Sequence, residues 1–224
     1  MTIETTEKTI WKRYGVELEF EQPVAASIPK TPDEVAAMLQ HRMPSEGAFK
    51  QMSDPVPVDE LAEQVTEEVG ATEEAERGWS TFKRDEDGIY LEARCLRGHI
   101  KDCAQQLAIF LDIRGLKAKV ANRVYVEPVC LRPTRTDGTP VKEIDGTETR
   151  MIHVITKRGP RNDIKYVDYV SPPSRLVFTL KVLNDGLVDR KLIESLFEYG
   201  GTHGMGQERS QQWGQYRVVA LTEE

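Results

Sequence analysis

The sequence contains few of the residues that build disulfide frameworks and metal sites. Among its 224 residues there are three cysteines and four histidines. No two cysteines have C-x-x-C spacing, and no two histidines have the spacing at which a helix presents two metal ligands. The cysteines are Cys95, Cys103 and Cys130, and the histidines are His41, His99, His153 and His203. We therefore expect no disulfide framework, no metal site and no cofactor.

Long apolar runs are also lacking. No run approaches the roughly 20 residues that are needed to cross a bilayer. The start of the chain, from Met1 to Glu7, has neither the basic region nor the apolar core of a secretion signal. We therefore expect a location in the cytoplasm and no membrane partner.

The chain has no overall basic excess, because its net charge is −7. This charge is unevenly distributed. Residues 1–87 contain 9 Lys and Arg against 20 Asp and Glu, whereas residues 88–224 contain 21 against 17. A polyanion would therefore be bound locally, in the second half of the chain, and binding would be helped by the assembly of several copies.

A glycine-rich stretch over residues 200–216 is the most informative part of the sequence. It follows a helical pattern and opens a strand, and it lacks Gly-Lys-Ser/Thr, so it is neither a dinucleotide fingerprint nor a Walker loop. Glycines such as Gly204 and Gly206 let a backbone approach a ligand closely. The side chains of Arg209, Gln211, Gln212, Trp213 and Tyr216 offer hydrogen-bond donors and rings for stacking. This combination favours a nucleic acid over a small metabolite, although the loop could equally serve only to turn the chain, with Trp213 as a core residue.

A second cluster of cations marks the start of the central helix. Arg94, Arg97, His99 and Lys101 lie there, although cations at a helix start oppose the macrodipole by about 0.3–1 kcal/mol each. A bound phosphate would offset that cost, and Gly98 would let its backbone come close. The alternative is that these side chains pair with acids of residues 1–87.

Hydrophobic periodicity predicts the order of the elements. Alternation over residues 13–21 predicts a strand, an apolar stripe over 96–111 predicts a helix, and strands follow near 124–130, 151–156 and 176–183. A final helix, capped by Asp189, precedes a strand over 213–221. Without the segments Phe20–Gly88 and Pro133–Pro173, the order is strand, helix, strand, strand, helix, strand. The predicted fold is α+β, with a ferredoxin-like or RRM-like antiparallel sheet and helices on one face.

The remaining segments are predicted to extend one domain of residues 1–224. Residues 22–87 form an acidic, mostly helical insertion, and residues 133–173 form a hairpin-like excursion. Residues 59–76 contain eight acids and no Lys or Arg, with apolar residues at four-residue spacing. This pattern indicates a solvated acidic helix, which could bind a protein partner.

Together, the two cationic segments resemble the RAMP superfamily of CRISPR-associated proteins, the backbone and repeat-RNA-processing subunits. In that family a late helix leads into a Gly-x-Gly loop, a basic-Ser pair and an aromatic-Gly-basic-aromatic ending, and this sequence departs from the pattern with Gln215 at the basic position. The matching residues are Gly204-Met205-Gly206, Arg209-Ser210 and Trp213-Gly214-Gln215-Tyr216, and Leu96–Lys101 resembles the segment before the family's first helix. The chain also resembles phage or prophage proteins that carry this core, which would place it in a bacterial cell or in the host cytoplasm.

The resemblance implies binding of single-stranded nucleic acid, RNA rather than DNA, without catalysis. Arg94, Arg97, Lys101 and Arg209 would contact phosphates, the loop glycines would admit the backbone, and Trp213 or Tyr216 would stack a base. One alternative is a structural protein whose core forms homo-oligomers and whose acidic insertion binds a protein or mimics nucleic acid. Another is a metal-independent endoribonuclease using His203 or His99, for which the sequence identifies no second catalytic partner.

Overall fold

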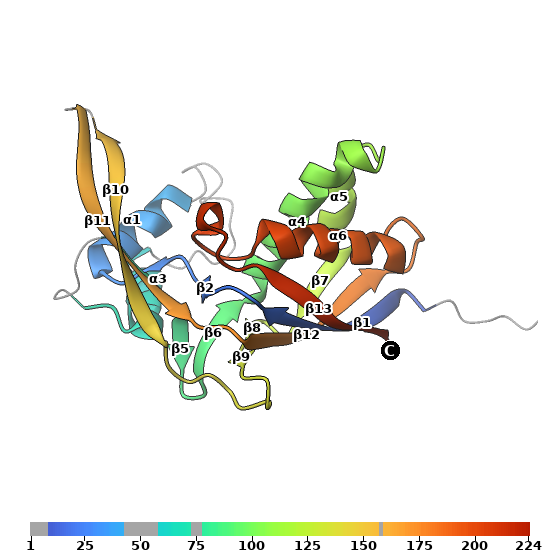
Figure 1. Cartoon of the computed structure of the whole chain (residues 1–224), viewed down its shortest axis with the longest axis horizontal. Helices are drawn as coiled ribbons and strands as arrows, with labels where there is room; N and C mark the ends of the chain where they lie inside the picture. The colour runs from blue at the N-terminus through green and yellow to red at the C-terminus, as the bar shows by residue number, and fades with distance from the viewer. Residues whose placement is uncertain (1–8, 43–57, 73–77, 157–158) are drawn as a thin grey trace, which may run out of the picture.

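The computed structural model describes residues 9–42, 58–72, 78–156 and 159–224. Its main antiparallel sheet has the spatial order β13-β1-β12-β7. The elements of this core are β1 (Trp11–Phe20), α4 (Ala93–Phe110), α5 (Leu116–Ala121), β7 (Val124–Glu127), β12 (Ser174–Leu183), α6 (Arg190–His203) and β13 (Tyr216–Glu223). The helices α4 and α6 lie on the same side of the sheet (Figure 1). This is the ferredoxin-like α+β fold that the sequence predicts.

The core forms where the two periodicities of the sequence meet. Every second residue of β1, namely Tyr14, Val16, Leu18 and Phe20, is buried, because successive strand side chains point to opposite faces. On α4 the apolar stripe that includes Leu96, Ile100, Cys103 and Leu107 is buried against them. The other face of the sheet carries the charged and polar residues of β1.

The start of α6 follows the expected capping chemistry. The side chain of Asp189 accepts a hydrogen bond of 2.8 Å from the backbone N–H of Leu192. This bond satisfies one of the free amide hydrogens at the helix start and fixes where the helix begins. The apolar face that follows, which includes Ile193, Leu196 and Phe197, is buried in the core.

The segment between β1 and α4 contains both helices and short strands. They are β2 (Val24–Ala25), β3 (Ile28–Pro29), α1 (Pro32–Arg42), α3 (Val58–Val69), β4 (Trp79–Thr81), β5 (Lys83–Asp85) and β6 (Gly88–Glu92). The acidic helix expected over residues 59–76 ends at Val69 and is followed by a turn at Gly70, which has a positive φ of 60°. Residues 73–76 of that expected helix lie outside the described residues.

The segment between β7 and β12 contains a long hairpin. Its strands are β8 (Cys130–Leu131), β9 (Pro133–Thr134), β10 (Gly146–Thr156) and β11 (Gly159–Val170). The β10–β11 hairpin projects away from the main sheet (Figure 1). The strand expected over 151–156 is part of β10, which begins earlier, at Gly146, and pairs along its length with β11. Sequence periodicity did not predict β11.

Two short strands replace the single strand expected near residues 124–130. β7 ends at Glu127 and pairs with β12, whereas β8 begins at Cys130 and pairs with β6. Pro128 lies between them, and proline cannot donate a ladder hydrogen bond. The chain therefore leaves the main sheet at this position.

The two additions to the core share a second sheet, with the order β10-β11-β4-β3. β11 pairs in parallel with β4 and antiparallel with β2, so a strand from residues 133–173 binds strands from residues 22–87. A buried carboxylate reinforces this junction. Asp168 on β11 accepts hydrogen bonds from Trp79 Nε1 at 2.8 Å and from Thr147 Oγ1 at 2.6 Å. The additions therefore hold each other in place beside the core.

Candidate functional site

The first turns of α4 present three cations. The helix begins after Glu92, whose side chain makes no capping hydrogen bond, and its first turn contains no acidic residue. Arg94, Arg97 and Lys101 follow and are all at least partly exposed. The free amide hydrogens and the positive end of the helix dipole have the same sign of charge as these side chains. The start of α4 therefore attracts anions.

The structure gives the three cations different surroundings. Arg94 Nε donates to Glu92 Oε2 at 2.8 Å. Arg97 Nη2 donates to the carbonyl oxygen of Ala121 at 2.5 Å, and its guanidinium lies 4.6 Å from the centroid of the Tyr125 ring. Among the described residues, none forms a salt bridge or hydrogen bond with the Lys101 ammonium, which lines an open pocket. Lys101 is thus the cation of this helix that is available to a ligand.

These cations do not neutralise the acidic front half of the chain. The salt bridge of Arg94 is with Glu92, which belongs to the second half. In the described parts of residues 1–87, no acid forms a salt bridge with Arg94, Arg97 or Lys101. The acidic helix α3 instead uses Glu68 to bind Lys83 on β5. Within the described residues, the pairing with acids of residues 1–87 that the sequence suggested is therefore absent for the cations at the start of α4.

Gly98 leaves the backbone of α4 accessible. A Cβ built at this position would meet no atom within 4 Å, and the residue lines the same pocket as Lys101. A ligand can therefore approach the helix backbone at this point without meeting a side chain.

The glycine-rich loop, in contrast, is closed upon the protein itself. Met205 N–H donates to the carbonyl oxygen of Gly214 at 2.9 Å, and Gly214 N–H donates to that of Pro23 at 2.7 Å. A Cβ at Gly206 would overlap the carbonyl oxygen of Ala25, and a Cβ at Gly204 would overlap that of Trp213. The loop glycines therefore allow other parts of the protein's own backbone to approach closely. The expectation that Gly204 is open to a ligand backbone is corrected accordingly, because Gly204 is buried, whereas Gly206 is exposed and lines the pocket described below.

The two aromatic residues of the loop point into the protein. Trp213 is 9% exposed and packs with Ala25, Val167 and Tyr169. Tyr216 is 4% exposed, and its hydroxyl lies 2.9 Å from Nε2 of His99. Neither ring has an open face, so neither can stack a base in this structure. Burying the apolar surfaces of these two rings stabilises the folded protein, so the rings at the end of the loop pack inside and are not exposed to a ligand.

The tip of the loop is polar and tied to the hairpin. A short 3₁₀ turn, η1 (Arg209–Gln211), carries Gln211 on the surface, and Gln212 is exposed beside it. Glu208 forms salt bridges with Lys165 of β11 at 2.5 Å and with Arg150 of β10 at 3.6 Å. The second sheet therefore positions the loop.

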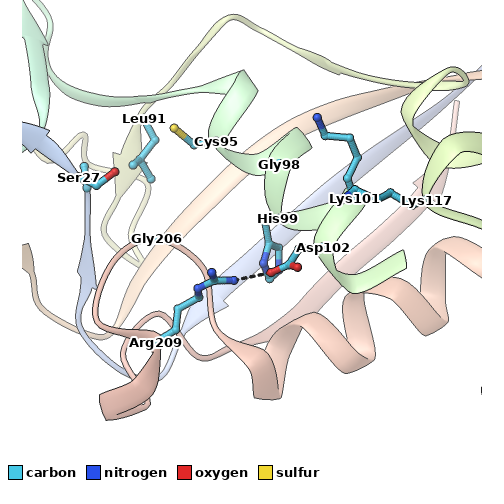
Figure 2. Close-up of a pocket in the computed structure, with 11 residues that line it drawn as sticks. Ser27, Leu91, Cys95, Gly98, His99, Lys101, Asp102, Lys117, Gly206 and Arg209 are labelled. Carbon is cyan, nitrogen blue, oxygen red and sulfur yellow. Dashed lines mark hydrogen bonds and ion pairs between the residues drawn. The ribbon is translucent and has the colours of Figure 1, made fainter. Parts of the chain in front are cut away.

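One open pocket joins the start of α4 with this loop. Its volume is about 450 Å³. Its walls are Ala26, Ser27, Leu91, Cys95, Gly98, His99, Lys101, Asp102, Lys117, Gly206 and Arg209. Figure 2 shows Arg209 reaching from the loop towards Asp102 on α4. Lys101, Lys117 and Arg209 come from α4, α5 and the loop, against a single carboxylate, so the lining is positive on balance.

Arg209 is held by Asp102 and His203. Its Nη1 lies 2.8 Å from Asp102 Oδ2 and 2.8 Å from His203 Nε2. His203 Nε2 also lies 3.1 Å from Asp102 Oδ2, so it can accept from Arg209 when unprotonated or donate to Asp102 when protonated. The hydrogen bond from Arg209, followed by that from His203, lowers the pKa of Asp102. Arg209 is therefore committed to a local network at the edge of the pocket.

His99 lies beneath that network and is buried. Burial, with the nearby charges of His203 and Arg209, lowers the pKa of His99 to about 3. Burial also raises the pKa of the neighbouring Cys103 thiol to about 12. The rings of His99 and His203 are stacked with their centroids 6.2 Å apart. The structure thus brings the two histidines together, but His99 is neutral near pH 7 and closed off by Tyr216.

Two charged residues of the pocket were missed by sequence reasoning. Lys117 on α5 lines it and donates to Gln105 Oε1 at 2.7 Å, and Asp102 supplies its carboxylate. A sequence signal existed for Lys117, because Arg114, Lys117 and Lys119 form a basic run. No signal in the sequence pointed to Asp102, since its role depends on contact with a loop more than a hundred residues away.

Within residues 9–42, 58–72, 78–156 and 159–224, no group of three or more His, Cys, Asp and Glu could hold a metal ion. In those same ranges, no helix combines the length and the apolar character that a membrane crossing requires.

Comparisons with known proteins show a remote likeness of structure. No protein-family model matches the chain, and no curated protein matches it. Among solved structures, it is similar to a chain of the type III-B Cmr-beta complex bound to cognate target RNA, with a TM-score of 0.48 and 10% identity. The match covers 95% of this chain and 60% of that one, so this chain spans about 60% of its neighbour's length. A likeness of this degree does not assign an activity or a ligand.

Proposed function

We propose that this protein binds single-stranded nucleic acid without cleaving it, and that the pocket between α4, α5 and the glycine-rich loop holds a phosphate of the strand. The observation that carries the proposal is the unpaired Lys101 ammonium beside the open backbone of Gly98, with Lys117 and Arg209 on the other walls. Cations from three segments around one open hollow are suited to a phosphate oxygen.

The shape of the pocket favours a single strand over a duplex. Its cations line a hollow rather than a raised surface. The phosphates of a duplex lie on a stiff cylinder, whereas those of a single strand can follow a concave surface. RNA is proposed over DNA because the loop resembles the RAMP pattern, and we propose a RAMP-type relationship for the same reason. The net charge of −7 outside this site limits the affinity of one copy, so assembly of several copies along a strand is part of the proposal.

The surroundings of the two histidines support binding without catalysis. His99 is buried, and its low pKa keeps it unprotonated at neutral pH. His203 Nε2 already contacts Asp102 and Arg209. A general base must reach the proton that it removes, and the Nε2 atoms of both histidines are already engaged, that of His99 by the Tyr216 hydroxyl and that of His203 by Asp102 and Arg209. Incubation of labelled RNA with the protein in the presence of a chelator tests this part, because cleavage lost on His203→Ala would instead establish a metal-independent ribonuclease.

Fluorescence anisotropy tests the proposal. Labelled single-stranded RNA, single-stranded DNA and duplex are titrated with the wild-type protein, with Lys101→Glu and with Lys191→Glu, at low and moderate salt. Lys191 is a matched control, because it is exposed in the first turn of α6 whereas the pocket borders the other end of that helix. We expect salt-sensitive binding of single strands, weakened at least about tenfold by Lys101→Glu and little changed by Lys191→Glu.

Three outcomes would contradict the proposal. Absence of single-strand binding by the folded protein at low salt would exclude it. Association that persists or strengthens as salt rises would indicate an apolar interface and favour the interaction-protein alternative, with homo-oligomers or a partner of the acidic helix α3. Equal losses in Lys101→Glu and Lys191→Glu would place the binding surface outside the pocket.

A further inference from the structure

The open face of the main sheet is neutralised by its own ion pairs over most of its area. Arg175 on β12 binds Glu17 at 2.7 Å and Glu19 at 2.8 Å on the neighbouring strand β1. Arg217 on β13 reaches Glu19 as well. Cross-strand pairs of this kind leave little net charge for a polyanion. This part of the face offers no evident binding surface.

One corner of the same face is different, because it presents two aromatic rings. Trp11 begins β1, and Tyr125 lies on the edge strand β7. Their ring centroids are 5.6 Å apart with an interplanar angle of 89°, and Tyr125 is 39% exposed. Core formation does not require these rings, because the residues that alternate with them on β1 and β7 supply the buried side. The corner is thus an aromatic surface turned towards solvent.

Cations flank both rings. Lys181 Nζ lies 4.9 Å from the Trp11 ring centroid, and the Arg97 guanidinium lies 4.6 Å from that of Tyr125. An edge-to-face contact uses the face of one ring, and each cation uses one face. A hollow of about 210 Å³, lined by Trp11, Tyr125, Glu127 and Lys181, keeps part of the ring surface open to a ligand.

From this arrangement we infer that the corner formed by Trp11, Tyr125, Arg97 and Lys181 is a stacking site for an unpaired nucleobase. The inference rests on the proposed function and adds a second contact to it. Every base has a face that can stack on an aromatic ring or a guanidinium plane. Glu127 in the wall forms a salt bridge with Arg13 at 3.0 Å through Oε2. Its other carboxylate oxygen can accept a hydrogen bond from an exocyclic amino group, so the hollow suits the edge of a base.

Arg97 links the stacking site with the phosphate pocket. It lies one turn before Lys101 on α4, a rise of about 6 Å along the axis. Its partner Ala121 lies one turn after Lys117 on α5, and Lys117 also lines the pocket. A strand whose phosphate contacts Lys101 can therefore place a neighbouring base at Tyr125. This assigns Arg97 to the stacking site instead of the phosphate contact expected from the sequence.

The test separates base recognition from charge. Tyr125→Ala and the control Val177→Ala, another exposed residue of the open face, are titrated with a labelled single-stranded RNA and, in competition, with inorganic polyphosphate, which has no bases. We expect Tyr125→Ala to weaken RNA binding about tenfold and to leave polyphosphate binding unchanged, because stacking acts only on bases. Val177→Ala should change neither.

Tryptophan fluorescence can follow RNA binding in the wild-type protein, in which the proposed stacking site is intact. RNA should quench the emission of the wild-type protein, polyphosphate should not, and Trp11→Phe should remove most of the quenching. This measurement remains decisive if Tyr125→Ala does not fold. Equal losses of RNA and polyphosphate binding in Tyr125→Ala would show a structural role and overturn the inference.

The same data distinguish the two proposals. If the wild-type protein binds RNA, Lys101→Glu abolishes that binding, and Tyr125→Ala binds as the wild type does, then the stacking site is overturned while the proposed function stands. If the wild-type protein binds no RNA at low salt, the proposed function is overturned, and the stacking site with it.

Discussion

The glycine-rich loop and the first turns of α4 line the same pocket, but their glycines have opposite surroundings. At Gly214 in the loop, an added Cβ would overlap the backbone of Met205, and the φ of 72° is strained for any other residue. At Gly98 in α4, an added Cβ would meet open space. The loop is therefore filled by protein, whereas the helix surface is free for a ligand.

Their cations differ in the same way. Arg209 in the loop is bound to Asp102 and His203, while Lys101 in α4 has no partner among the residues described. The contrast shows that glycine and aromatic residues in a loop predict a close backbone approach. They do not show whether the approaching group is a ligand or another part of the protein. A cation with no acid nearby is a more direct sign of a ligand surface, because a buried or paired cation has already been neutralised.

The largest expected effect is that of Gly214→Ala. The new methyl group would overlap the Met205 backbone and would force an L-residue into a positive φ, so we expect the free energy of unfolding to fall by at least about 3 kcal/mol. Urea denaturation followed by circular dichroism measures this. A loss below about 1 kcal/mol would show that the loop is not closed as described.

The next effect concerns His99, which lies beneath both regions. Its folded-state pKa of about 3 lies below the ordinary value of 6.5, so the unfolded chain takes up a proton first as the pH falls. The resulting stability is complete above about pH 6.5 and is lost towards pH 3. We expect the free energy of unfolding to decrease by about 2 kcal/mol between pH 7.5 and pH 5.

Urea unfolding at the two pH values measures this difference in the wild type and in His99→Gln, where most of it should vanish. His153→Gln changes an exposed histidine and serves as the control. Asp102 is also shifted, but its lowered pKa makes it lose stability only below its ordinary value of 3.8, outside this range. An unchanged pH dependence in His99→Gln would contradict the burial of a neutral imidazole.

A smaller effect should come from breaking the salt bridge between Arg209 and Asp102. Asp102→Asn removes the single carboxylate of the pocket and frees Arg209, so RNA affinity should rise about threefold to tenfold at low salt. Anisotropy titrations measure the change, with Glu194→Gln on the exposed face of α6 as the control. A loss of affinity would mean that Asp102 positions Arg209 for the ligand, and the contrast between the two regions would weaken.

The smallest effect is expected at Gly98. Gly98→Ala meets no atom within 4 Å and replaces glycine inside a helix, so it should stabilise the protein by about 0.5–1 kcal/mol. The same methyl group would stand where a phosphate approaches the backbone, so RNA binding should weaken severalfold. Thermal unfolding tests the expected gain in stability, and anisotropy on the same preparation tests the expected loss of RNA affinity. Unchanged binding would move the ligand away from this turn of α4.

The core of the fold could be predicted because its signals are local. Alternation at Tyr14, Val16 and Leu18 identified β1, and the apolar stripe from Leu96 to Leu107 identified α4. β11 could not be predicted in this way, since its pairing with β4 and β2 depends on segments far apart in the chain. The end of α3 at Val69 was missed because the acidic pattern continues beyond the residue at which the helix stops.

For the candidate site, the sequence by itself determined which residue types could bind a polyanion: the cations at the start of α4 and the polar, glycine-rich loop after α6. Only the tertiary structure decided which of them are free. The backbone of residues 23–26 hydrogen-bonds to the loop and closes it. Asp102 and His203 bind Arg209, and the Arg97 guanidinium stacks on the Tyr125 ring, while Lys101 has no partner among the described residues. The reason is physical: residue type sets the charge and conformational freedom of each group, but its availability depends on long-range contacts that form only when the sheets assemble.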